Sequence, residues 1–277
     1  TGGAFGSDFG VMLAWSRITA DVAKDENVCL VLCDDPWLFR HLAEIPGVTA
    51  GTPPRLHLTE LKLSIRGWLA RTKAALKSAL ASNRLVKTGI QGGATILVYG
   101  HPQSTADGFD AYFGDLMTHE PELQRILHTD CDVARATELS SDGRTSSLHA
   151  WGHTFFALCL IWTKWRPGRS FTQGEYGWLV RRSAAKENSG GGPAMNRWQL
   201  HCQGNWLREA KPSRVFWPWE NHSWERGLCR AGQKYGIHTL GYQHTVVGPH
   251  QINYSTRTNP DGLDSIPETV ICDGPAY

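Results

Sequence analysis

Short, uninterrupted apolar runs alternate with segments of helical periodicity along this chain, and this order constrains the fold more than any other feature. The runs 27–33 (NVCLVLC) and 94–99 (ATILVY) are typical of strands buried on both faces of a parallel sheet. Helical spacing of apolar residues marks 11–24 and 59–85. The alternation predicts an α/β fold with a Rossmann-like, doubly wound parallel sheet.

The remaining elements are expected from the same patterns. We expect strands at 214–217, 237–242 and 268–272, and helices at 36–42, 121–127, 194–209 and 223–235. The most apolar segment, 148–165, is short for a membrane span and predicts a buried helix, with an interfacial membrane contact as the alternative. We expect 102–212 as a whole to be a mostly helical insertion.

Composition narrows the class of protein. With 277 residues and 19% charged residues the chain can form a full hydrophobic core, and its formal net charge of +2 argues against a nucleic-acid partner. The twelve Trp suit sugar rings or interfaces, and a Trp-rich core is the alternative. Seven Cys without CxxC spacing argue against a disulfide framework or a zinc ribbon and favour a reducing, cytoplasmic compartment.

Two carboxylates follow the expected strand at 214–217. Glu220 comes directly after the strand, where side chains reach the ligand-binding edge of a parallel sheet. Glu225 lies in the first turn of the next helix, which Asn221 or Ser223 would cap, and whose free N–H groups suit a phosphate. In the structural alternatives, Glu225 only complements the helix dipole and Glu220 pairs with an arginine of that helix, Arg226 or Arg230.

Histidines lie at equivalent positions elsewhere in the expected sheet. Gln243 and His244 end the strand after Glu220 and would reach the same edge, where an imidazole can exchange a proton with a substrate. His101 follows the strand at 94–99. In the structural alternative His244 only caps its strand. His149 and His153 have i, i+4 spacing, but the chain offers no obvious third metal ligand.

The segment Pro218–Glu225 has the pattern P-x-E-x-x-x-W-E, and it is followed by GYQH at 241–244 and by Asn253–Tyr254. This order resembles bacterial surface-polysaccharide glycosyltransferases of the capsule and O-antigen type, which have the GT-B fold. The segment 110–116 (DAYFGDL) is similar to an N-terminal-domain motif of the same group. The clear match covers about residues 215–277.

The resemblance implies that this chain is the N-terminal part of a longer, two-domain protein. Residues 1–266 would form the Rossmann-like acceptor-side domain. Residues 267–277 would form its last strand and the start of a linker to a C-terminal nucleotide-binding domain. A Gly-rich loop near residue 1 would approach the donor phosphates, and a simple tight turn is the alternative.

Roles for individual residues follow from their positions in the chain and from what glycosyl transfer requires. Glu220 and His244 are the candidate catalytic pair. The candidate substrate-binding residues are Gly2, Gly3, Asp8, His101, Trp224, Glu225, Tyr242, Gln243 and Tyr254. We expect neither a metal nor a cofactor, because enzymes of this fold generally work without a bound metal.

The expected function is transfer of a sugar from a sugar nucleotide to a growing surface polysaccharide or lipid-linked glycan. The expected location is the cytoplasm, with peripheral contact at the inner face of the cytoplasmic membrane. Two alternatives remain open: a sugar-nucleotide epimerase of the same fold, and a non-catalytic carbohydrate-binding or assembly subunit.

Overall fold

A computed structural model describes residues 8–25, 28–88, 92–244 and 262–272. The chain divides into two compact units. The first combines Thr1–Ala74 with Ile161–Ala194, and the second combines Ala75–Leu160 with Met195–Tyr277. Two helices, α4 (Leu56–Arg84) and α10 (Gly192–Ala210), contribute residues to both units.

The second unit contains a six-stranded sheet in which every neighbouring pair is parallel, in the order β3-β2-β1-β4-β5-β6. This is the strand order of the doubly wound nucleotide-binding folds, so the predicted α/β class with a parallel sheet is confirmed. The strands are β1 (Ala94–Val98), β2 (Gln124–Leu127), β3 (Thr145–Ser147), β4 (Arg214–Pro218), β5 (His238–Gln243) and β6 (Thr269–Cys272).

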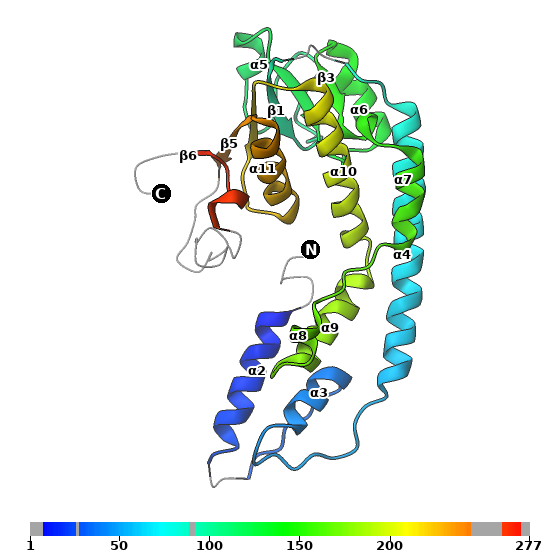
Figure 1. Cartoon of the computed structure of the whole chain (residues 1–277), viewed down its shortest axis with the longest axis vertical. Helices are drawn as coiled ribbons and strands as arrows, with labels where there is room; N and C mark the ends of the chain where they lie inside the picture. Colours follow the sequence, from blue (N-terminus) through cyan, green and yellow to red (C-terminus); the bar gives the residue numbers. More distant parts are fainter. Residues whose placement is uncertain (1–7, 26–27, 89–91, 245–261, 273–277) are drawn as a thin grey trace. The chain divides into compact units, whose positions relative to one another are not determined.

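Helices of the second unit cover the sheet (Figure 1). Leu139 and Ala136 of α6 (Val133–Leu139) are fully buried in one cluster with Ile96 and Val98 of β1. The helix α11 (Ser223–Tyr235) packs on β5, where a Cβ at Gly232 would lie 2.6 Å from Thr239 Cγ2. Shorter helices complete the unit: α5 (Leu116–His119), η1 (Ser140–Asp142), η2 (Leu148–Trp151), α7 (Thr154–Cys159) and η6 (Gly262–Ser265).

The first unit is helical in its described part. Besides α4 up to Ala74 it includes α2 (Phe9–Val22), α3 (Pro36–Ala43), α8 (Arg169–Thr172) and α9 (Gly177–Asn188). The short helix η3 (Leu160–Trp162) spans the division between the units. Leu38 and Leu42 of α3 and Leu179 of α9 form its buried core. Asp35 caps α3 by accepting the N–H groups of Trp37 and Leu38, and it pairs with Arg182 Nε at 2.6 Å.

Three sequence-based expectations for individual elements are wrong. Residues 28–33 form no strand, and their side chains are largely exposed, Val28 and Leu32 most of all. Residues 124–127 form β2 rather than a helix. The segment 148–165 is not one buried helix but contains three short helices. Its Phe155 and Trp162 are 80% and 79% exposed.

These differences have a common physical reason. An apolar run shows that a segment tends to be buried, but it does not show what the segment packs against. Neither the period nor the length of a short run therefore tells a strand from a helix. Both β2 and β3 lie within 102–212, and the segment that we expected to be an insertion therefore supplies part of the sheet.

Among the described residues no helix has the length and apolarity needed to cross a membrane.

Candidate functional site

The candidate site lies where the chain leaves the carboxyl ends of β1, β2, β4 and β5. In a doubly wound sheet, the first two crossovers and the later ones turn in opposite directions, so a crevice opens between β1 and β4. Tyr99 follows β1, His128 follows β2, Glu220 follows β4 and His244 follows β5. All four come from the second unit.

The Glu220 carboxylate lies between two imidazoles. Its Oε2 is 2.7 Å from His222 Nε2, and its Oε1 is 3.5 Å from His244 Nε2. The side chain of Glu220 is 40% exposed and that of His222 is 50% exposed, whereas that of His244 is 21% exposed. A half-exposed carboxylate beside imidazoles, at the edge where ligands bind, has the composition of a proton-transfer site.

Glu225 holds the loop that presents Glu220. Its carboxylate is fully buried and accepts the backbone N–H of Asn221 at 2.7 Å and that of Glu220 at 3.1 Å. Asn221 is in the left-handed region, with φ of 58°, which asparagine tolerates better than most residues. Burial raises the pKa of Glu225 to about 8, although the two N–H donors act in the opposite direction. Glu225 therefore fixes the backbone of the loop by hydrogen bonds from a buried position.

The start of α11 differs from the expectation. The residue preceding the helix is His222, whose side chain makes no capping hydrogen bond, and neither Asn221 nor Ser223 takes the capping position. The N–H groups of Glu220 and Asn221 bind Glu225. These two donors, which precede the helix, are therefore used within the loop, and the expectation for the N–H groups of the helix itself stays a prediction.

A group of aromatic rings begins at His244, the imidazole 3.5 Å from the Glu220 carboxylate. Tyr112 meets His244 edge to face, with ring centroids 5.5 Å apart, and its ring centroid lies 6.2 Å from that of Tyr99. His128 lies 4.8 Å from Tyr99 and 4.9 Å from Trp224, again between centroids. Rings of this kind offer flat apolar faces with polar tips, which suit a sugar or a base.

A buried ionic cluster positions Tyr112. The Asp110 carboxylate accepts the N–H of Tyr112 at 2.9 Å and the hydroxyl of Ser104 at 3.2 Å. Arg125 of β2 is also fully buried, lies 3.9 Å from Asp110 and 3.4 Å from Asp142, and donates to the Thr105 carbonyl at 2.9 Å. The segment 110–116 (DAYFGDL) thus contains a turn that Arg125 of β2 anchors to the sheet, and Tyr112 of this turn contacts His244.

Burial also changes how the tyrosines ionise. It raises the pKa of Tyr99 well above that of a free tyrosine, and the nearby Glu225 adds to the effect. The pKa of Tyr112 is raised as well, by burial first and then by Glu220. Both phenols therefore keep their protons at neutral pH and can donate hydrogen bonds.

The remaining predicted residues fall in different places. Tyr242 lies 6.2 Å from His244 between ring centroids, and His101 lies 6.1 Å from Tyr112, so both border the site. Gln243 is buried, and its Oε1 accepts from Cys272 Sγ of β6. Asp8 precedes α2 in the first unit, away from any strand in sequence. Gly2, Gly3 and Tyr254 lie outside the described residues.

Sequence reasoning missed four residues of the site: Tyr99, Tyr112, His128 and His222. Tyr99 and His128 share the one signal that could have found them, because each is the first residue after a strand. The assignment of 121–127 to a helix hid that signal for His128. Tyr112 and His222 come from loops, whose course depends on Asp110 and Glu225.

His149 and His153 do not form a pair. His149 is fully buried, and its two ring nitrogens contact the Thr129 carbonyl and the Trp198 indole N–H, both at 2.9 Å. Burial lowers the pKa of His149 to about 4. His153 instead lies against His201. Across the described ranges, no group of three or more His, Cys, Asp and Glu side chains is arranged to hold a metal ion.

Comparison with protein-family models, with curated proteins and with solved structures gave no match to this chain.

Proposed function

We propose that the chain is part of a glycosyltransferase that moves a sugar from a sugar nucleotide to a growing surface polysaccharide or lipid-linked glycan. The observation that supports this most is the Glu220 carboxylate, half-exposed at the carboxyl edge of a parallel sheet and flanked by His222 and His244. In this proposal the second unit is one Rossmann-like half of a GT-B enzyme. A partner domain would supply most of the nucleotide contacts.

In the proposed reaction the acceptor hydroxyl oxygen forms a bond to the anomeric carbon of the donor sugar. The bond between that carbon and the phosphate oxygen breaks, and the nucleotide leaves with the electron pair. Glu220 takes the hydroxyl proton, and His244, whose Nε2 is 3.5 Å away, stabilises the carboxylate and can pass the proton on. Tyr112, which is partly exposed, would contact the sugar rings, whereas Trp224 is 6% exposed.

Release of free nucleotide from a panel of sugar nucleotides tests the proposal. We expect release by the full chain, joined to its partner domain where the parent protein has one, only when a lipid-linked glycan extract is present. Turnover of a nucleotide sugar without any acceptor would contradict transfer and favour the epimerase. Sugar binding without turnover across the panel would favour a binding subunit.

A further inference from the structure

One face of α4 in the first unit is apolar and exposed. Leu58, Leu61, Ile65, Trp68 and Leu69 have exposed fractions between 48% and 58%. At about 100° per residue, the five positions fall within an arc of about 100°, so they form one stripe along the helix. We call these five residues the α4 stripe.

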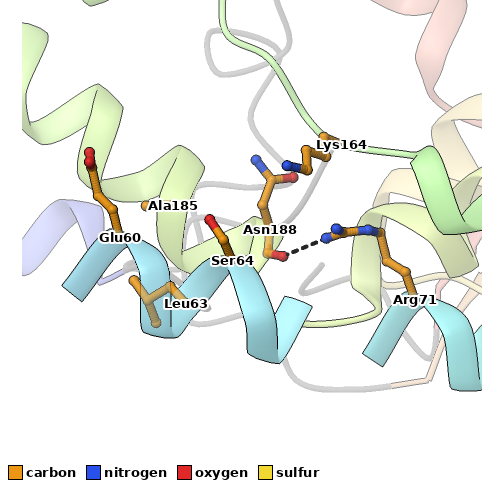
Figure 2. A pocket seen from close by; sticks show the side chains of 7 residues that line it. All are labelled: Glu60, Leu63, Ser64, Arg71, Lys164, Ala185 and Asn188. Atoms are coloured by element: carbon orange, nitrogen blue, oxygen red, sulfur yellow. Dashed lines mark hydrogen bonds between the residues drawn. The ribbon is translucent and has the colours of Figure 1, made fainter. Parts of the chain in front are cut away.

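The opposite face of α4 is the packed one. Gly67 lies so close to α9 that a Cβ there would be 1.9 Å from the Asn188 carbonyl oxygen. Arg71 is 2% exposed and donates to the carbonyls of Asn188, at 2.8 Å, and Ile161, at 3.0 Å. Figure 2 shows Glu60 and Arg71 on this side of α4, in a pocket with Asn188 and Lys164. The stripe is therefore the face that the unit leaves uncovered.

Charge along the helix is strongly asymmetric. The sequence of α4 has six Lys and Arg residues and one acidic residue, Glu60, which lines the packed-side pocket. Lys62, Arg66 and Lys73 are exposed. At about 100° per residue, all three fall on the same side of the stripe. No acidic side chain of this helix lies on the stripe or on its basic flank.

Leu and Trp on one face, with Lys and Arg beside them, is the pattern of helices that lie in the headgroup region of a bilayer. Trp favours this zone because its ring is apolar and its N–H is polar. We infer that the α4 stripe docks on the surface of a bilayer that contains anionic lipids.

The helix α2 provides an internal comparison. It also exposes apolar side chains, Val11, Trp15 and Ile18, at 53%, 49% and 54%. Its charges are balanced, because its basic residue Arg17 is matched by its acidic residue Asp21. Apolar exposure alone therefore does not distinguish the two helices, whereas the basic flank does. The inference concerns lipid binding only and does not rest on the proposed chemistry.

The test is flotation of the full chain with vesicles of phosphatidylcholine, with and without phosphatidylglycerol. We expect binding only to the vesicles with phosphatidylglycerol and loss of binding at high salt, because counterions screen the attraction. Lys62→Gln, Arg66→Gln and Lys73→Gln together should weaken binding by on the order of 10- to 100-fold. Leu61→Gln with Trp68→Gln should weaken it comparably.

Matched variants serve as controls. Arg17→Gln, Lys24→Gln and Lys234→Gln remove as much positive charge elsewhere, and Val11→Gln with Ile18→Gln removes apolar area from α2; neither should change binding. Gln preserves helix propensity, and unchanged melting would confirm that the exposed sites tolerate it. Equal binding to vesicles without anionic lipid, no binding, or equal loss in the controls would overturn the inference. So would a dimer that only the α4 variants dissociate.

Discussion

The carboxylate of Glu225 accepts the backbone N–H of Asn221 at 2.7 Å, and through this bond a buried acid determines where the half-exposed acid Glu220 lies. The two glutamates of the P-x-E-x-x-x-W-E segment therefore have different positions and different tasks. One is inside the loop and shapes it. The other is at the surface of the sheet edge, within reach of a substrate.

Replacement of Glu225 by Gln should change how stability depends on pH. The folded-state pKa of Glu225 is about 8, above the ordinary 4.5, so the folded protein holds this proton more tightly than the unfolded chain. Its contribution to the free energy of unfolding is therefore greatest below about pH 4.5 and is lost as the pH rises toward about 8.

Glu225→Gln resembles the protonated form and removes this dependence. We expect a variant close to wild type at pH 5 and more stable than wild type by a few kcal/mol at pH 8.5. Denaturant unfolding at both pH values measures the difference. Parallel pH profiles for the two proteins would show that Glu225 does not carry the raised pKa.

Part of the second unit follows from its sequence, since the continuous apolar run Ala94–Val98 is a strand of the parallel sheet, as its pattern predicts. The positions of Glu220, Tyr242 and His244 at one edge follow from the same logic. The place of Tyr112 does not, because it depends on a turn that Asp110 and Arg125 hold together from residues 15 positions apart. An ion pair between residues far apart in the chain produces no periodic pattern in the sequence, so it cannot be predicted from such a pattern.

The same limit explains the misassigned run at 28–33. Its apolar residues are typical of a central strand, but no strand among the described residues pairs with it. In the first unit the core is made instead by helices, with Leu38, Leu42 and Leu179 at its centre. Which run enters the sheet is decided by the whole chain and not by the run.

Replacement of Arg125 by Met should destabilise the second unit strongly. The variant leaves Asp110 and Asp142 without the guanidinium that compensates their burial, a loss that typically costs about 3–5 kcal/mol. Chemical denaturation measures the change. Lys24→Met is the control. The side chains of Lys24 and its partner Asp21 are 74% and 68% exposed, so their pair should contribute under about 1 kcal/mol to the free energy of unfolding. A similar effect of both variants would contradict the buried-cluster interpretation.

Gly100→Ala should be destabilising because the new Cβ would lie 2.3 Å from Cys131 Sγ and 3.0 Å from Cys131 Cβ. Crowding of this kind typically costs about 1–3 kcal/mol. Cys131→Ala removes the sulfur, so the double variant should recover part of the loss. A double-mutant cycle by thermal unfolding measures that coupling, and purely additive effects would mean that the two residues do not meet.

His244→Ala and His222→Ala separate the two imidazoles beside Glu220. His244 is the less exposed of the two, and its ring meets Tyr112, so its loss should reduce kcat for sugar transfer by about 10²-fold or more. His222 is 50% exposed, and its loss should change kcat less. Initial rates with both variants decide this. Loss of melting temperature instead of rate in His244→Ala would show that His244 only supports the fold.

The most direct test of the central claim is acceptor-dependent nucleotide release by Glu220→Gln, measured beside wild type in the parent protein. Gln keeps the size of the side chain and cannot take the acceptor proton, so we expect release to fall by about 10²- to 10⁴-fold while the melting temperature stays that of wild type. Release within a few-fold of wild type would contradict the assignment of Glu220 as the base and, with it, the proposed site.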